Sequence, residues 1–544
     1  MTANASSFSA TSRSDGLRVE LAGSGLLPAM PRAFLEGRER DLLAPLRFLP
    51  PGELPAPRPQ PAPDRRALAE ALRVANRAYG NRRADELADL LARPETRVVV
   101  TGQQPGILGG PLYTLSKAVA AARWAAALEA AGQPAVAVFW VATEDHDFRE
   151  VSALTVLARG GSRKLSLGED PEPLAPVGMR TLGRGIEAVL AELAELMPGD
   201  RYGRWLDEIR HWYRPEARFG EAFCRLMSGL LGDYSPLFLD AMDADIKRLQ
   251  RPWLEKIVER RAEVAAASAA ADERIVERGF ALQVSPQPGT SPLFLLHRGE
   301  RRRIEWTAEG YRLRGGDDAG GSIAELLEIV RDNPAVVSPG VLARPAIQDA
   351  LLASDLQLLG PGELSYMPQV AALYPVLGIT APWTTLRPQA MVVEGHQLEH
   401  LEELSLPLES LLGDRRSLDR KLSELGGGDL LAAPRQRVEA ILAEVGTAAL
   451  AVDGNLERPF DKTREQILRA LDKFSDKVAA AAVRSDEVRS RRIDRLREAL
   501  LPDGRMQERV VFSAHFRGKH EQRFVDSLWQ QMDLDGGVLQ VITP

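Results

Sequence analysis

Two short polar stretches of the sequence combine residue types that can do chemistry. The first, TEDHD, places Glu144, Asp145, His146 and Asp147 at four consecutive positions. Neighbouring carboxyl and imidazole groups perturb one another's pKa, which suits proton transfer, and the same groups can hold a divalent metal ion. Adjacent side chains point in different directions, so at most two of the four can face one site. The stretch is a candidate acid–base cluster, and a capping and salt-bridge cluster is the non-catalytic alternative.

The second stretch, TGQQPGILGG, places two neighbouring glutamines in a glycine-rich turn. Its spacing matches neither a P-loop nor a dinucleotide fingerprint. Exposed backbone N–H groups before a helix favour an anion, and the amides of Gln103 and Gln104 can orient a polar substrate. A turn with both glutamines facing solvent is the alternative. The candidate binding residues are Thr101, Gly102, Gln103, Gln104 and Gly106 in this stretch and Tyr113 shortly after it.

A third stretch, GPGELSY, carries Gly360, Gly362, Glu363 and Tyr366 behind another glycine-rich turn. Arg344 lies upstream in VLARP. Because a guanidinium group can hold a carboxylate through two parallel hydrogen bonds, Arg344 is a candidate anion-binding residue.

The elements around these stretches predict where they lie. RVVVTG reads as a buried strand, residues 113–131 as a helix that stops at Gly132 and Pro134, and AVAVFWVA (135–142) as the next strand. Continuous apolar strands around a helix indicate a βαβ unit in a parallel sheet covered on both faces. Such sheets bind ligands at the carboxyl ends of their strands. With a further strand running into the Gly-Pro-Gly turn of LQLLGPGELSY (356–366), we expect all three stretches at one edge.

The rest of the chain divides by pattern. Residues 1–390 form the α/β core, with PLFLDAMD (236–243) as another core strand and insertions at roughly 152–215 and 275–330, the second hairpin-like. Heptad spacing within 391–502 predicts an α-helical antiparallel coiled coil, with its bend at Gly426–Gly428 and a break or kink at Pro459. Residues 503–544 are apolar enough to dock back on the core.

Composition excludes several classes of protein. The net charge of −7 argues against a dedicated nucleic-acid binder. The only cysteine, Cys224, lies in an apolar helical pattern, so neither a disulfide nor a structural zinc site is expected. The N-terminus has no apolar signal region, and 135–142 is far too short to cross a bilayer. We expect a cytoplasmic protein without a membrane partner.

Taken together, the motifs resemble a known family. VVVTGQQPGILGGPLYTLSKA, VFWVATEDHDFREV, SPGVLARPAIQDALL, LLGPGELSYM and MQERV look like the bacillithiol biosynthesis cysteine-adding enzymes, the BshC cysteine ligases. The resemblance runs from about residue 15 to the C-terminus in the same order. It implies a Rossmann-like core with inserted segments, a helical coiled-coil domain, and candidate site residues in the TGQQPG, EDHD, RP and GPGE-x-SY motifs.

The resemblance also implies a reaction, in which the carboxyl group of L-cysteine forms an amide with the amine of glucosaminyl-malate. Ligases of this type commonly use ATP, so ATP with Mg²⁺ is a candidate co-substrate. We expect His146 or Asp147 to act as the base for the attacking amine. The alternatives are a metal-dependent hydrolase or nucleotidyltransferase that uses EDHD, and a non-enzymatic coiled-coil adaptor. The heptad seam makes a homodimer an expectation, although an internal hairpin satisfies the same pattern.

Overall fold

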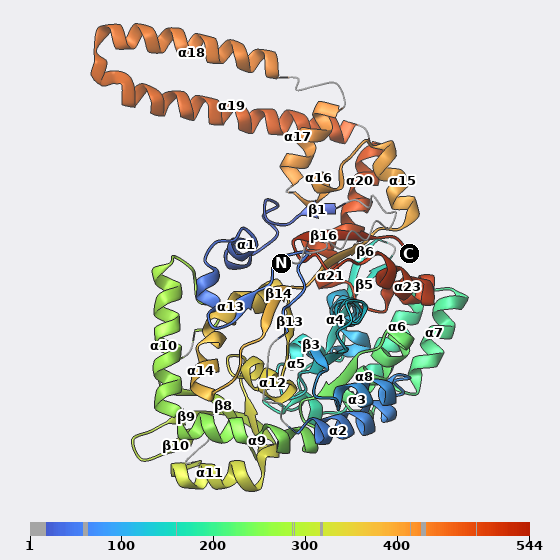
Figure 1. Ribbon diagram of the computed structural model, residues 1–544. Coiled ribbons are helices and arrows are strands. Elements are labelled where there is room, and N and C mark those ends of the chain that lie inside the picture. Colours follow the sequence, from blue (N-terminus) through green and yellow to red (C-terminus); the bar gives the residue numbers. More distant parts are fainter. Residues whose placement is uncertain are drawn as a thin grey trace, which may run out of the picture. The chain divides into compact units, whose positions relative to one another are not determined.

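The chain folds into two units, and the computed structural model describes residues 18–544 except 58–63, 159, 286, 288, 316–318, 414, 426–430 and 486. One unit comprises Met1–Val392 with Gln507–Pro544, and the other comprises Val393–Met506 (Figure 1). The C-terminal segment thus belongs to the same unit as the α/β core. The unit boundaries lie after Val392 and after Met506. The sequence predicted them after 390 and after 502, two and four residues earlier.

A six-stranded parallel sheet forms the centre of the first unit. Its strands, in spatial order, are β2 (Arg47–Phe48), β14 (Trp383–Leu386), β13 (Leu356–Leu359), β3 (Arg97–Gln103), β4 (Ala135–Val141) and β7 (Leu237–Asp240). Helix α4 (Leu112–Ala130) connects β3 to β4, which confirms the predicted βαβ unit. From β3 the chain proceeds to β4 and β7 on one side, and it later adds β13 and β14 on the other. The strand order therefore reverses at β3.

Both faces of this sheet are covered, which explains why its strands are apolar without alternation. Along β3, Val98 and Val100 belong to one apolar cluster and Val99 belongs to the other. The first cluster includes side chains of α2 (Arg65–Ala78), of α3 (Ala84–Leu91), of the start of α9 (Ala244–Glu259) and of the end of α12 (Arg344–Leu352). The second includes side chains of α4, α8 (Phe219–Leu231) and α23 (Gln522–Gln531).

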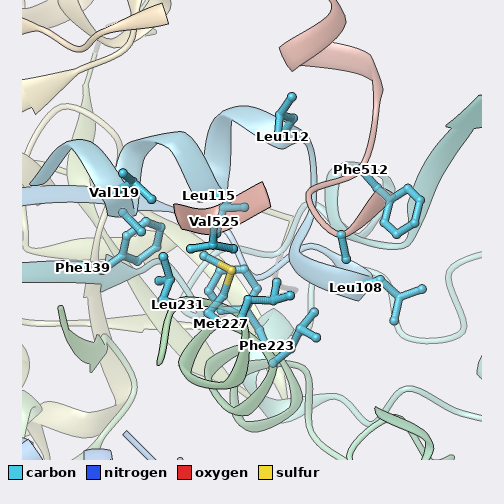
Figure 2. Packing of buried hydrophobic residues seen from close by; sticks show 14 of the residues in the cluster. Leu108, Leu112, Leu115, Val119, Phe139, Phe223, Met227, Leu231, Phe512 and Val525 are labelled. Carbon is cyan, nitrogen blue, oxygen red and sulfur yellow. The ribbon is translucent and has the colours of Figure 1, made fainter. Parts of the chain in front are cut away.

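Helix α4 lies inside the second apolar cluster. Figure 2 shows its residues Leu115 and Val119 among side chains of α8 and of the C-terminal segment, such as Met227 and Val525. Most of the helix is buried around its whole circumference, as expected for a helix without a polar face. Lys117 is a buried charged residue of this helix. Its ammonium group must therefore have buried partners.

Two insertions extend the core. Between β4 and β7 lie α5 (Phe148–Val151), the hairpin of β5 (Ala153–Ala158) and β6 (Gly161–Ser166), α6 (Gly185–Leu196), α7 (Asp200–Arg210) and α8. Between β7 and β13 lie α9, α10 (Arg261–Glu277), β8 (Thr290–His297), β9 (Glu300–Trp306), β10 (Tyr311–Leu313), β11 (Gly320–Gly321), α11 (Ile323–Asp332), β12 (Val337–Pro339) and α12. Strands β8 and β9 form the expected antiparallel hairpin inside a five-stranded sheet of order β11-β10-β9-β8-β12.

The end of the chain returns to the core. Strand β16 (Val538–Ile542) pairs with β1 (Arg18–Glu20) on one side and with β15 (Gln389–Val392) on the other. Before it come α21 (Gln507–Val510), α22 (His515–His520) and α23. Helices α13 (Pro361–Ala371) and α14 (Leu373–Leu377) follow β13 directly.

The second unit is helical throughout its regular elements. These are α15 (Gly395–Glu403), α16 (Leu408–Leu412), α17 (Arg415–Leu425), α18 (Ala432–Val452), α19 (Glu457–Ser485) and α20 (Glu487–Leu500). Helices α18 and α19 form an antiparallel pair, and the ion pair between Arg435 and Asp472 joins them (Figure 1). None of the helices that the structure describes combines the length and the apolar character needed to cross a membrane.

Two expectations for the helical unit need revision. The turn between the long arms lies at Gly454–Leu456, where Asp453 accepts a hydrogen bond from the backbone of Asn455. The glycine run 426–428, expected at the bend, lies outside the described residues. Pro459 neither breaks nor kinks α19, because it lies in the first turn, where backbone N–H groups have no intrahelical partner.

Candidate functional site

A cavity of about 700 Å³ opens at the carboxyl edge of the parallel sheet, beside the strand at which the order reverses. This is where open α/β sheets bind their ligands. Its walls include residues that follow β3, β4, β13 and β14, together with side chains from the five-stranded sheet. All the site residues expected from the sequence line it except Thr101 and Gly106: Gly102, Gln103, Gln104, Tyr113, Glu144, Asp145, His146, Asp147, Arg344, Gly360, Gly362, Glu363 and Tyr366.

The two exceptions have structural roles. Thr101 is buried and donates its hydroxyl hydrogen to the carbonyl oxygen of Leu358, at 3.0 Å, which ties β3 to β13. A Cβ atom on Gly106 would lie 2.7 Å from the Cα of Gly110, so the turn requires a glycine there. Neither residue is positioned to contact a ligand in the cavity.

The glycine-rich loop does not form the anion cradle expected from its sequence. The backbone N–H groups of Gly106, Gly109 and Gly110 donate to carbonyl groups within the loop. The first N–H of α4, from Leu112, donates to the carbonyl oxygen of Val511, at 2.7 Å. The C-terminal segment therefore covers this helix start, and these four donors are already engaged within the protein.

The two glutamines at the end of β3 have separate partners. The Lys117 ammonium donates to Gln103 Oε1, at 3.0 Å, and Gln103 Nε2 donates to the Tyr113 hydroxyl, at 3.2 Å. Gln104 Nε2 donates to Asp145 Oδ2, at 2.7 Å. The loop after β3 is thereby joined to the loop after β4. Gln104 thus holds the Asp145 carboxylate, which lines the cavity, in position.

The four residues of the EDHD cluster have different surroundings. Glu144 is buried at the cavity wall and forms an ion pair with Lys247, so its carboxylate is already neutralised. Asp147 is exposed and accepts a hydrogen bond from the backbone N–H of Glu150, which caps α5. Asp145 accepts the N–H of His146, at 2.7 Å, in addition to the Gln104 amide. These contacts give Glu144 a structural role in place of the catalytic role expected for it.

His146 lies against an arginine from the insertion. Nη1 of Arg301 is 3.2 Å from His146 Nδ1. Burial lowers the pKa of His146, and the Arg301 charge adds to this effect. The imidazole is therefore the neutral form at neutral pH.

The GPGELSY stretch forms the start of a helix and not a loop. Gly360 is the N-cap of α13, and its N–H donates to Glu363 Oε2, at 2.7 Å. Burial opposes ionisation of Glu363, but the Lys117 ammonium outweighs it and holds the pKa of Glu363 below its ordinary value. Burial raises the pKa of Tyr366 to about 12, so its phenol is neutral.

Several cavity residues were not anticipated from the sequence. Lys117 was recognisable as a charge within the apolar first half of a helical pattern, and Arg387 follows a strand end as the other motifs do. Arg301 and Arg303 come from β9, where nothing local indicates a site. Further residues of this kind are Glu150 and Arg509.

Three of the cavity arginines have no carboxylate partner among the described residues. Arg303 lies over the Phe294 ring, at 4.8 Å, Arg344 donates to Gln348 Oε1, at 2.8 Å, and Arg509 is exposed. Uncompensated guanidinium groups around a cavity favour an anionic ligand. Within the described part of the chain, no three carboxylate, imidazole or thiol side chains gather as metal ligands would.

Comparisons with known proteins agree with this architecture. Residues 55–388 match the N-terminal Rossmann-like domain of bacillithiol biosynthesis BshC, and residues 390–543 match its C-terminal coiled-coil domain. A Salinibacter ruber protein named "Putative cysteine ligase BshC" is 34% identical over 88% of this chain and 89% of its own length. The protein of the same name from Symbiobacterium thermophilum is 32% identical over the same shares. The chain therefore belongs to the BshC family of bacillithiol biosynthesis.

Proposed function

We propose that the chain is a cytoplasmic ligase that joins L-cysteine to glucosaminyl-malate through an amide bond, giving bacillithiol. Family membership supports the ligase class, and the cavity supports the substrate. The observation that carries the proposal is that one cavity of about 700 Å³ is lined both by arginines without a carboxylate partner among the described residues and by the carboxylates of Asp145 and Glu150. Glucosaminyl-malate has the complementary groups, since its malyl part carries two carboxylates and its sugar carries an amine.

We assign binding of the malyl end to the cavity arginines. Arg303, Arg344 and Arg509 all line the cavity without a carboxylate partner among the described residues. Planar guanidinium groups recognise carboxylates through paired hydrogen bonds. In this proposal they bind and orient the acceptor, and Arg344 has the role expected from the sequence.

The amine end of the acceptor then lies near the carboxylates. An amine must lose a proton before or during attack, which requires a base. His146 is a poor candidate, because its Nδ1 atom is directed at Arg301, and Asp147 is engaged in capping α5. Desolvation of the carboxyl group raises the pKa of Glu150, although the Gln104 amide opposes this effect. A carboxylate with a raised pKa accepts a proton more readily, so we assign the base to Glu150, with Asp145 holding the amine.

The carboxyl group of cysteine needs activation, because a free carboxylate does not react with an amine in water. We propose ATP with Mg²⁺ as the co-substrate. Because the N–H groups of Gly106, Gly109, Gly110 and Leu112 are engaged within the protein, we assign any phosphate contact to the arginines that have no carboxylate partner among the described residues.

The direct test is to incubate the purified chain with cysteine and glucosaminyl-malate, with and without ATP and Mg²⁺, and to detect bacillithiol by mass. We expect product only with a nucleoside triphosphate. An active family member serves as the positive control. No product under any nucleotide condition, while the control is active, would contradict the proposal.

We also propose that the chain forms a homodimer through its helical unit. Ile441 and Val445 on α18 and Phe474 on α19 are more than half exposed. Exposed apolar side chains in a heptad pattern are typical of a helix that pairs with another chain. Sedimentation velocity would show a dimer, and polar substitutions at these three positions would convert it to a monomer.

A further inference from the structure

The contact between Arg301 and His146 fixes more than the position of the imidazole ring. Arg301 Nη1 and His146 Nδ1 are 3.2 Å apart. A guanidinium group has only donors and stays protonated in proteins, so Nδ1 must be the acceptor. A neutral imidazole carries one N–H, and that N–H must then be on Nε2.

The arginine is held rigidly in the position that imposes this state. Its Nε atom donates to Ser338 Oγ, at 2.9 Å, and Nη2 donates to the Pro339 carbonyl oxygen, at 2.8 Å. The guanidinium carbon lies 3.9 Å from the centre of the Phe294 ring, and the residue is 7% exposed. One bond to a side-chain hydroxyl, one bond to a backbone carbonyl and one aromatic face hold the Arg301 guanidinium against Nδ1.

The charged groups facing the ring do not change this conclusion. Asp145 and Asp147, from the same loop, raise the pKa of His146, whereas burial, Arg301 and Arg180 lower it. The net direction is downward, and Asp145 Oδ1 is 3.7 Å from Nδ1, beyond hydrogen-bonding distance. His146 lines the cavity, and its Nε2 atom has no hydrogen-bond partner within the described residues.

We propose that His146 acts as a hydrogen-bond donor, through Nε2–H, to the acyl oxygen of the cysteine substrate, and that Arg301 is the positioning residue that fixes this tautomer. The inference rests on the proposed ligase function. During attack, the amine nitrogen forms a bond to the acyl carbon and the oxygen gains negative charge. The bond to the activating group, supplied by a nucleoside triphosphate, then breaks with its electron pair. The amine proton passes to Glu150, while His146 keeps its own proton and stabilises the oxygen.

The tautomer is testable on the resting protein without any substrate. The full-length chain is labelled with ¹⁵N-histidine, and the His146 ring signals are assigned among the seven histidines by comparison with His146→Gln. We expect a neutral ring with the proton on Nε2 at pH 7. A proton on Nδ1, or a charged ring, overturns the inference whatever the activity of the enzyme.

The positioning role of Arg301 has its own spectroscopic readout. In Arg301→Met, the ring loses its fixed donor, so we expect a mixture of tautomers and a higher pKa of His146. Arg302→Met is the matched control, because Arg302 is the next residue of β9, does not line the cavity and makes its hydrogen bond to the Arg314 carbonyl oxygen. An unchanged tautomer in folded Arg301→Met would overturn the positioning role.

The activity of His146 variants distinguishes a hydrogen-bond donor at this position from a base. The amide nitrogen of glutamine can occupy the place of imidazole Nε2, whereas that of asparagine corresponds to Nδ1. We expect His146→Ala and His146→Asn to lose about 10²–10³-fold in kcat, the typical effect of removing one oxyanion donor, and His146→Gln to recover at least tenfold of that loss. Equal loss in all three variants would overturn the donor role. An inactive wild-type protein would refute the ligase function and leave the tautomer result standing.

Discussion

Lys117 Nζ lies 2.6 Å from Glu363 Oε2, and this buried ion pair joins α4 to α13 at the cavity wall. The same ammonium donates to the Gly102 carbonyl oxygen, at 2.8 Å, and to Gln103 Oε1. One charge inside an apolar helix therefore connects the end of β3 with the helix that follows β13. It also fixes which way the Gln103 amide points, because only the oxygen can face an ammonium.

Removing one member of this pair should destabilise the protein strongly. In Lys117→Met, the Glu363 carboxylate remains buried without its cation, and such changes cost about 3–5 kcal/mol. The double variant Lys117→Met with Glu363→Met should recover most of that loss, since an apolar pair of similar volume is often tolerated. Urea unfolding measures both, and exposed Lys164→Met is the control, expected within about 0.5 kcal/mol of wild type. A double variant as unstable as the single one would contradict this account.

The core of the fold was predictable because its signals are local. The apolar strands 97–102 and 135–142, and the helix stop at Gly132 and Pro134, specify a βαβ unit without any distant information. The rule that ligands bind at strand carboxyl ends then located the three motif stretches at one edge, where the structure brings them together around a cavity.

The rest of the site depends on contacts between distant segments. Arg301 meets His146 across 155 positions of sequence, and Arg387 pairs with Glu508 across 121. The glycine-rich loop has the composition of an anion site, but Val511 accepts the hydrogen bond of its helix start from about 400 residues away. No pattern within one segment reports which other segment covers it, so these features were not predictable from the sequence.

The activity should rise with pH as Glu150 ionises. Its pKa in the folded protein is raised above the ordinary value of 4.5, chiefly by desolvation, so the acid limb of kcat/KM should have its midpoint above that value. Below the midpoint the carboxyl group is protonated and cannot accept the amine proton. Glu150→Gln should lose about 10²–10⁴-fold in rate, the usual contribution of a general base, and should lack this limb.

The same substitution should not destabilise the fold. Because the folded state raises the pKa of Glu150, the ionised carboxylate is disfavoured there, and its contribution to stability falls as pH rises from 4.5 through the folded-state pKa. At pH 7, Glu150→Gln should therefore unfold at or above the wild-type temperature. An acid limb that persists in Glu150→Gln would assign the base to another group.

Arg344 should contribute to acceptor binding more than to the chemical step. In Arg344→Ala, we expect the KM for glucosaminyl-malate to rise at least tenfold with little change in kcat, the signature of lost uniform binding. Arg344→Lys should not restore the KM, since an ammonium cannot form two parallel hydrogen bonds to a carboxylate. Arg302→Met, on the face of β9 away from the cavity, is the control. A fall in kcat at unchanged KM would place Arg344 elsewhere in the mechanism.

Gly102 should tolerate no side chain, although it lies at the cavity wall. A Cβ atom there would be 2.8 Å from the Trp140 carbonyl oxygen and 3.0 Å from Trp140 Cβ, on the neighbouring strand β4. The strands would have to separate, so Gly102→Ala should cost about 1–3 kcal/mol, as overpacking does.

Gly362 also lines the cavity, but a Cβ atom there has open space and the residue lies in helix α13. Gly362→Ala should therefore unfold at or above the wild-type temperature, since alanine favours a helix over glycine. Thermal unfolding of the two variants compares them directly, and equal midpoints would show that sheet packing does not select the glycine at position 102.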